Sequence, residues 1–166
     1  MEKIHSRRFI VGFLIVAVCV ILLLSAFMSW HEMRIKRIDI RDYGFAAPSI
    51  VYSNMDEIKT ESVADEHILS LSGWCVIKKF QTCPIEMHVV LHDPKSDEAY
   101  VLPTTVVKRH DVTEFFSDAV NYDYSGFKTK LSYDSSDFPG GIYNIYLLYK
   151  VEEQTVLVDL QRVVAI

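Results

Sequence analysis

The sequence predicts an all-β protein: an antiparallel, immunoglobulin-like β-sandwich of about seven strands, preceded by one transmembrane α-helix. Two observations support this prediction. From residue 50 onward, apolar and polar side chains alternate in short runs separated by turn-forming residues, a pattern typical of sandwich strands. Before these runs, the 22 residues from Phe9 to Trp30 carry no charge. The 166-residue chain therefore divides into one hydrophobic segment and one compact domain.

The hydrophobic segment has the length of a membrane span. A helix needs about 20 apolar residues to cross a hydrocarbon core of roughly 30 Å, and it satisfies its own backbone hydrogen bonds. Signal peptides have shorter apolar cores, of about 7–15 residues, and end in a small-x-small cleavage site, which the stretch from Ala26 to Trp30 matches poorly. We therefore expect an uncleaved anchor at 9–30 after a short tail at 1–8. A cleaved signal peptide is the alternative.

Basic residues flank the segment on both sides: Lys3, Arg7 and Arg8 before it, and Arg34, Lys36, Arg37 and Arg41 after it. Arg7 and Arg8 abut the apolar core directly, whereas acidic residues dilute the later cluster. This asymmetry predicts a single-pass protein of the cell membrane, with a cytoplasmic amino terminus and an extracytoplasmic domain.

The two sides of the segment differ in net charge. The tail carries three basic residues and one acidic residue, or +2, whereas the part after Trp30 carries 14 basic and 21 acidic residues, or −7. An acidic domain argues against nucleic acid as a partner, because phosphates require a basic surface. It also argues against a domain that lies flat on anionic lipid.

Residues 31–49 are expected to form a juxtamembrane linker, which the run from Gly44 to Pro48 interrupts, and residues 50–166 the sandwich. Two strands, at 68–78 and 85–92, are predicted to pair as a hairpin. The inward side chains expected from the alternation are Leu69, Leu71, Cys75, Ile77, Ile85, Met87, Val89 and Leu91.

A third strand is expected over 100–107, where Pro103 indicates an edge or a bulge. Residues 111–119 are expected to form a short helical turn capped by Asp111. Further strands are predicted over 127–133, 142–151 and 155–165, the last two joined at Glu152 and Glu153.

Cys75 and Cys83 flank the predicted hairpin turn, eight residues apart. If the hairpin is centred near Lys79, the two lie opposite each other, where cross-strand Cβ separations approach disulfide reach. A disulfide would suit an oxidising compartment. The alternative is two buried free thiols.

No metal site, cofactor site or catalytic motif is expected. His88 and His92 lie on a predicted strand, where four residues span roughly 13 Å, too far to share one ion. The sequence has no Gly-x-Ser-x-Gly elbow, phosphate loop or His-Glu-x-x-His motif. We therefore predict that the protein is not an enzyme and has no cofactor.

The candidate ligand-binding residues are mainly aromatic. Trp74 lies on the polar side of its strand, where it can stack on a sugar or a partner, or pack beneath the short helix. Arg109 and Asp111 either fix a loop as an ion pair or contact a ligand. The candidate ligand-binding residues are Trp74, Tyr100, Arg109, Asp111, Tyr124 and Phe127.

Four short segments resemble a pattern in β-sandwich modules that accompany bacterial cell-envelope polysaccharide enzymes, often glycosyltransferases. They are 55–58 (MDEI), 68–74 (ILSLSGW), 109–112 (RHDV) and 124–127 (YSGF). The resemblance covers roughly residues 50–150 and implies a non-catalytic, carbohydrate-associated role in a bacterium. Such modules often have a small residue after the Gly-Trp pair, where this chain has Cys75.

The function expected from these observations is a membrane-anchored, non-catalytic binding or accessory module in cell-envelope polysaccharide assembly, with an envelope glycan as ligand. The alternative is a structural subunit that docks onto a multi-pass membrane enzyme or transporter through both anchor and sandwich. Small residues in the anchor, among them Gly12 and Ala17, would permit close helix contact.

Overall fold

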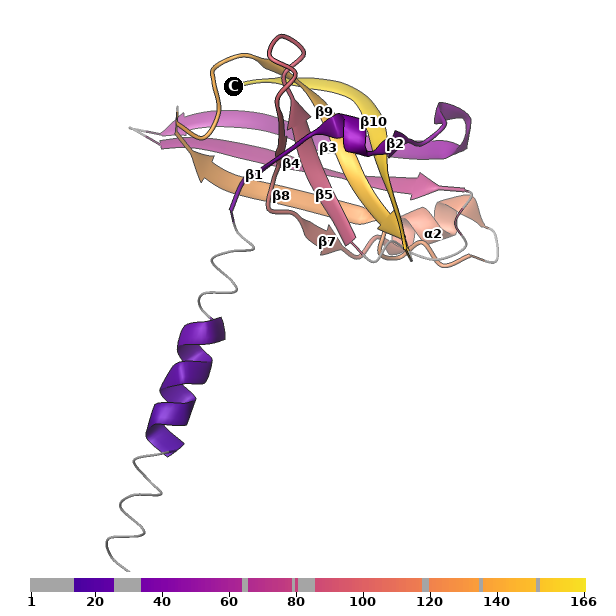
Figure 1. The fold of residues 1–166 in the computed structure, drawn as a ribbon. Coiled ribbons are helices and arrows are strands. Elements are labelled where there is room, and N and C mark those ends of the chain that lie inside the picture. The colour runs from indigo at the N-terminus through magenta and orange to yellow at the C-terminus, as the bar shows by residue number, and fades with distance from the viewer. Residues whose placement is uncertain are drawn as a thin grey trace, which may run out of the picture. The chain divides into compact units, whose positions relative to one another are not determined.

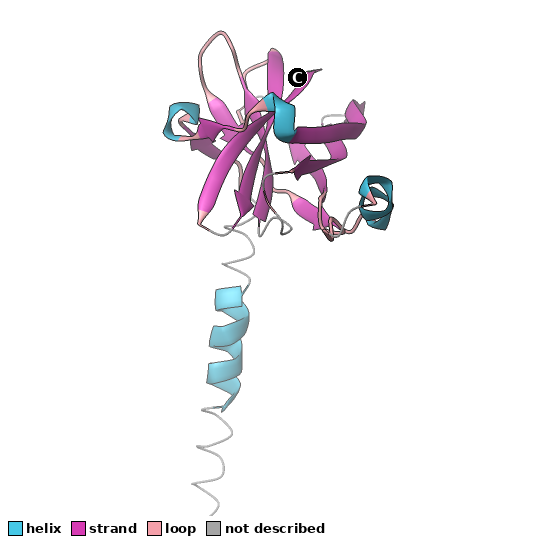
Figure 2. Cartoon of the chain, turned by 90° about the vertical axis from the view of Figure 1, so that its right-hand side faces the viewer, coloured by secondary structure: helices cyan, strands magenta, loops and turns pink. Residues whose placement is uncertain are grey.

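The computed structural model describes residues 14–25, 34–63, 66–78, 80, 86–117, 120–134, 136–151 and 153–166. The chain forms two compact units, Met1–Arg34 and Ile35–Ile166. The second unit is built mainly of strands, with short helical turns at its surface (Figure 2).

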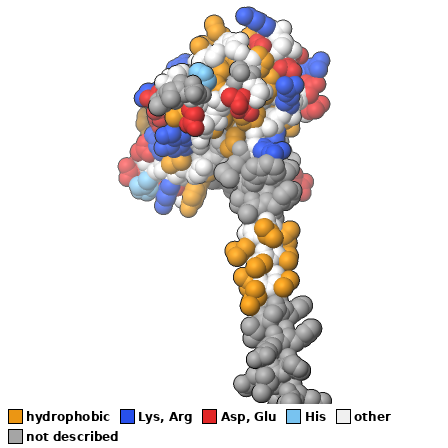
Figure 3. Space-filling view, turned by 90° about the vertical axis from the view of Figure 1, so that its left-hand side faces the viewer, with side chains coloured by type: hydrophobic (Ala, Val, Ile, Leu, Met, Phe, Trp, Pro, Cys, Tyr) orange, Lys and Arg blue, Asp and Glu red, His pale blue; other side chains and the backbone are white. Residues whose placement is uncertain are grey.

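The described part of the first unit is one helix, at residues 14–25, whose exposed side chains are largely hydrophobic (Figure 3). Within the described ranges, no helix has the length and apolar character needed to span a membrane. The prediction of a transmembrane anchor at 9–30 is therefore wrong. The predicted single-pass location at the cell membrane and the assigned orientation, which depend on that anchor, are not supported either.

The second unit contains two β-sheets (Figure 1). The six-stranded sheet has the order β1-β6-β5-β9-β10-β2, and the four-stranded sheet the order β3-β4-β8-β7. Strand bounds are β1 Lys36–Ile38, β2 Gly44–Phe45, β3 Val51–Val63, β4 Glu66–Ile77, β5 Glu86–His92, β6 Ala99–Val101, β7 Thr105–Val107, β8 Gly126–Tyr133, β9 Ile142–Val151 and β10 Gln154–Ala165. The pairings are antiparallel, except that β2 runs parallel to β10. A mostly β fold of two sheets agrees with the predicted sandwich, although short strands raise the number above seven.

The main core contains the side chains that the alternation placed inward. Leu69 and Leu71 of β4 and Val89 and Leu91 of β5 are fully buried in one hydrophobic cluster. Because successive side chains of a strand point to opposite faces, period-two patterning was sufficient to identify them.

A second cluster covers the outer face of the six-stranded sheet. Val90 and Leu157 are fully buried there beneath Ile38, Ile40 and Tyr43. These covering side chains come from the segment predicted as a linker, which instead holds β1, β2 and two 3-10 turns, η1 (Ile40–Asp42) and η2 (Pro48–Ile50). The globular unit therefore begins at Ile35 and not at residue 50.

The predicted hairpin between residues 68–78 and 85–92 is wrong. β4 pairs with β3 and β8 in one sheet, and β5 pairs with β6 and β9 in the other. The predicted disulfide fails with the hairpin: Cys75 is a free, fully buried cysteine, and no disulfide is found in the described part of the chain. Burial raises the pKa of the Cys75 thiol to about 12. Cys83 lies outside the described residues.

Pro103 divides the predicted third strand into β6 and β7, which belong to different sheets. Proline cannot donate to a ladder, and β7 is an edge strand, as Pro103 indicated. The predicted helical turn exists as α2 (His110–Phe116), but Arg109 and not Asp111 is its N-cap residue, and the cap makes no side-chain hydrogen bond. The β9–β10 hairpin is confirmed.

Candidate functional site

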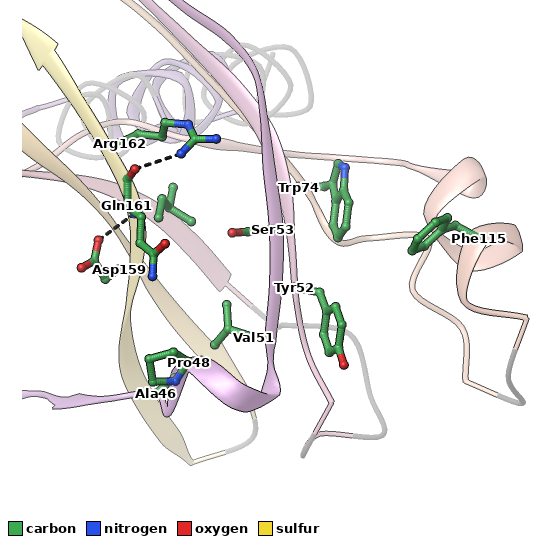
Figure 4. A pocket seen from close by; sticks show the side chains of 11 residues that line it. Ala46, Pro48, Val51, Tyr52, Ser53, Trp74, Phe115, Asp159, Gln161 and Arg162 are labelled. Carbon is green, nitrogen blue, oxygen red and sulfur yellow. Dashed lines mark hydrogen bonds between the residues drawn. The ribbon is translucent and has the colours of Figure 1, made fainter.

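A cavity in the described part of the chain has a volume of about 480 Å³, within the range of small-molecule sites. It lies between the first residues of β3 and the middle of β10, bordered by η2 and α2 (Figure 4). Its lining residues are Ala46, Pro48, Val51, Tyr52, Ser53, Trp74, Phe115, Asp159, Leu160, Gln161 and Arg162.

The pocket extends around the open edge of β3. Lys78 N–H donates to the carbonyl of Ile50 at 2.9 Å. Along an antiparallel ladder, every second residue forms backbone hydrogen bonds with the partner strand. Like Ile50, Tyr52 therefore directs its backbone N–H and C=O toward β4, whereas those of Val51 and Ser53 face away from β4. β3 is an edge strand in the described sheet, so these N–H and C=O groups face the pocket side.

A β-bulge in β10 supplies the polar wall. The register with β9 shifts between Asp159 and Arg162, and Gln161 has a φ of 53°. Gln161 N–H donates to Asp159 Oδ1 at 2.7 Å, and Arg162 Nη1 donates to the Gln161 carbonyl at 3.0 Å. A left-handed non-glycine residue costs about 1–2 kcal/mol, and bulges re-aim side chains beside sites. This bulge therefore directs polar groups to the pocket at a conformational cost.

Three aromatic rings form the opposite wall. Trp74 of β4 and Tyr52 of β3 both make edge-to-face contacts with Phe116 of α2, at centroid distances of 6.1 and 5.3 Å. Phe115, also of α2, is 73% exposed. Figure 4 shows Tyr52, Trp74 and Phe115 on one side of β3, with Ser53, Asp159, Gln161 and Arg162 on the other. Trp74 thus packs beneath α2, as the alternative interpretation held, and also lines the pocket.

Gly73 allows β3 and β4 to approach closely beside Trp74. A Cβ at this position would lie 2.3 Å from the Asn54 carbonyl oxygen and 3.0 Å from Cζ of Phe127. No larger residue fits there without moving the backbone. Close packing of the strands therefore explains the glycine before Trp74 without any ligand.

Two of the predicted ligand-binding residues belong to the core. Tyr100 and Phe127 are each 1% exposed, and the Tyr100 hydroxyl donates to Glu98 Oε2 at 2.5 Å. Tyr124 is 52% exposed and is not among the residues that line the pocket. The sequence showed that these side chains are aromatic, but two of them lie on the inner faces of their strands.

Arg109 and Asp111 form the loop-fixing ion pair that was one of the two predicted roles. Arg109 Nε and Nη2 donate to the Asp111 carboxylate at 2.9 and 2.8 Å, and Nη1 donates to Asp56 of β3. These hydrogen bonds raise the pKa of Arg109 and lower that of Asp111. The guanidinium therefore ties the start of α2 to the edge strand.

Asp123 anchors α2 from its other side. Its carboxylate accepts hydrogen bonds from Thr113 Oγ1 at 2.8 Å and His110 Nδ1 at 3.1 Å, and Lys108 Nζ lies 3.2 Å away. The Thr113 and His110 hydrogen bonds lower the pKa of Asp123 to about 2. The other ring nitrogen of His110 faces Glu114 at 3.5 Å. The arrangement holds the helix in place and presents no nucleophile to the imidazole.

A smaller pocket of about 230 Å³ is lined by a charged cluster from β5 and β9. Glu86 accepts from Lys150 Nζ at 3.2 Å and contacts His88 Nε2 at 2.6 Å, and the hydrogen bond with His88 is the main cause of its lowered pKa. His92 is directed elsewhere, toward Asp97. Among the described residues, no group of three or more His, Cys, Asp or Glu side chains is placed to hold a metal ion.

Sequence reasoning missed several pocket residues that the proposed site uses: Tyr52, Ser53, Phe115, Asp159, Gln161 and Arg162. One signal was present. One face of the predicted strand at 155–165 carries Val156, Val158, Leu160 and Val164, and the position on that face between the last two is Arg162. A charged residue at an inward position of a regular strand indicates a bulge or a site.

Comparison of the chain with protein-family models, curated proteins and solved structures finds no match. The resemblance to modules of polysaccharide enzymes therefore stays a prediction, and the function has to be argued from the pocket.

Proposed function

We propose that the globular unit is a non-catalytic saccharide-binding module that acts as an accessory in polysaccharide assembly. The supporting observation is that one pocket combines the rings of Tyr52, Trp74 and Phe115 with the polar groups of Asp159, Gln161 and Arg162. A sugar ring has an apolar C–H face and a hydroxyl rim. Aromatic side chains stack on the face, while carboxylate, amide and guanidinium groups hydrogen-bond the rim.

The polar set favours binding over hydrolysis. Glycoside hydrolysis generally uses two carboxyl groups on either side of the scissile bond. Of the described residues that line the pocket, Asp159 alone has a carboxyl group, and it already accepts a hydrogen bond from Gln161. An amide, a guanidinium and a single carboxylate suit recognition of hydroxyl groups without bond cleavage.

The proposal is tested by isothermal titration calorimetry, in which the full-length chain is titrated with a panel of neutral and acidic oligosaccharides. Phe115→Ala should weaken binding by about 2- to 13-fold, since an aromatic contact is worth about 0.5–1.5 kcal/mol. Tyr124→Ala is the matched control, because Tyr124 is also an exposed aromatic but does not line the pocket. Trp74→Ala should abolish binding; a melting curve separates this effect from loss of packing against α2.

Equal affinity of the Phe115 and Tyr124 variants, or no binding of any saccharide, would contradict the proposal. A chain that binds no saccharide and instead co-purifies with a multi-pass membrane enzyme or transporter would favour the subunit alternative.

A further inference from the structure

Arg162 occupies an unusual place in the pocket. It lies opposite Ile145 in the β9–β10 register, on the core-facing side of β10, yet it is exposed, whereas Ile145 is fully buried. The bulge ends at this residue, so its side chain leaves the core where the pocket opens (Figure 4). A regular strand would have pointed an arginine into the apolar interior, at a large desolvation cost.

The guanidinium of Arg162 has unused donors. Its one hydrogen bond in the described structure runs from Nη1 to the Gln161 carbonyl, out of five N–H donors. Arg37, Arg41 and Arg109 each form an ion pair with a carboxylate, at 3.1, 2.8 and 2.8 Å. Within the described residues, no carboxylate lies within ion-pair distance of Arg162.

Asp159, the acidic residue nearest to Arg162 in the sequence, forms no ion pair with the Arg162 guanidinium. Its Oδ1 accepts the backbone N–H of Gln161 at 2.7 Å, which turns the carboxylate toward the bulge backbone. In the pocket, the Asp159 carboxylate therefore already accepts a main-chain hydrogen bond, whereas the Arg162 guanidinium has N–H donors that face open space. A planar guanidinium matches the geometry of carboxylate and phosphate groups.

We infer that the pocket selects saccharides that carry an anionic group, a carboxylate or a phosphate, which Arg162 binds through its free N–H donors. This inference rests on the proposed saccharide function and narrows it to acidic sugars. The net charge of −7 in the part of the chain after Trp30 opposes such ligands only weakly, since charges beyond about 8 Å are screened at physiological salt.

The test compares three ligands that share stereochemistry and linkage: a neutral oligosaccharide, its uronic acid form and its 6-phosphate form. Each is titrated into the full-length chain at low and at physiological salt. The acidic forms should bind about 10–100-fold more tightly than the neutral form, because a hydrogen bond to a charged group is worth that much. The preference should shrink as salt rises.

Arg162→Gln should remove the preference, because the acidic forms should lose much more affinity than the neutral form. Arg162→Lys should keep part of the preference, because lysine retains the charge without the planar guanidinium. Lys128→Gln is the matched control, since it removes one exposed positive charge from a residue that does not line the pocket. Asp159→Asn should strengthen binding of the acidic forms by removing a like charge.

A preference for only one acidic form supports the inference and identifies the anionic group. Equal binding of the acidic and neutral forms, or equal losses of both in Arg162→Gln, would overturn the inference while the saccharide function stands. Absence of binding to all three ligands would overturn both. Melting curves of the two Arg162 variants show whether the fold is intact.

Discussion

Gln161 shows at the scale of one residue how the pocket is built. Its φ of 53° places a non-glycine residue in the left-handed region, and the Asp159 side chain holds this conformation through the Gln161 N–H. Strained backbone of this kind persists where surrounding structure enforces it, and it clusters at functional sites. The observation agrees with the bulge as the element that forms the site.

Substitution of Gln161 measures that strain. Gln161→Gly should leave the free energy of unfolding unchanged or raise it by up to about 1 kcal/mol, because glycine adopts positive φ without steric cost. Gln161→Val should lower it by about 1–2 kcal/mol, because a β-branched residue fits this region poorly. Urea unfolding of both variants is the measurement. A valine variant as stable as the glycine variant would show that the backbone is not constrained here.

At the scale of elements, α2 is the part of the site held by polar contacts as well as by packing. Arg109 and Asp123 fix its start, while Val112 and Phe116 pack toward Val76, Trp74 and Tyr122. The sequence predicted the helix and the Arg109–Asp111 pair because both are local. It did not reveal that Asp123 is the carboxylate that organises the loop, because that carboxylate lies ten or more residues from its donors His110 and Thr113.

The lowered pKa of Asp123 predicts how α2 responds to acid. Its folded-state pKa of about 2 lies below the ordinary value of 3.8, so its stabilising contribution is complete above about pH 4 and is lost as the pH falls toward 2. Trp74 fluorescence should report release of α2 over that window. Asp123→Asn should be less stable than the wild type at pH 6, and the difference should shrink below pH 4. A stability difference that stays constant down to pH 2 would refute this role.

At the scale of the whole molecule, residues 35–49 are part of the fold. They supply β1 and β2 at the two edges of the six-stranded sheet and cover Val90 and Leu157. Residues 31–49 were predicted to be a linker, but Ile38, Ile40 and Tyr43 pack on the sheet. The alternation of apolar and polar residues in this segment was too short, and its composition too mixed, to identify edge strands of two or three residues.

Truncation tests this assignment. A chain that begins at residue 50 should unfold at lower urea concentration than one that begins at residue 35. Burial of one large apolar side chain is worth about 1.5–3 kcal/mol, and several would be exposed. Equal unfolding midpoints for the two chains would show that the segment adds nothing to the sheet.

The sequence by itself determined which faces of β4 and β5 enter the core, because side-chain direction alternates with every residue whatever the neighbouring strand is. It also predicted a short helix from Asp111 onward, observed at His110–Phe116, and the β9–β10 hairpin, both of which depend on contacts between nearby residues. The same local reasoning favoured a membrane span at 9–30, whereas no helix of the described residues has the length and apolar character needed to span a membrane.

Only the tertiary structure decided which strands are neighbours. It separated β4 from β5, left Cys75 as a free buried thiol, and divided the run around Pro103 between two sheets. It also brought the β10 bulge beside Tyr52 and Trp74, although these segments lie more than 80 residues apart in the sequence. Strand pairing between distant segments is settled by packing and hydrogen bonding of the whole chain, for which period-two alternation contains no information. The pocket is a product of those pairings.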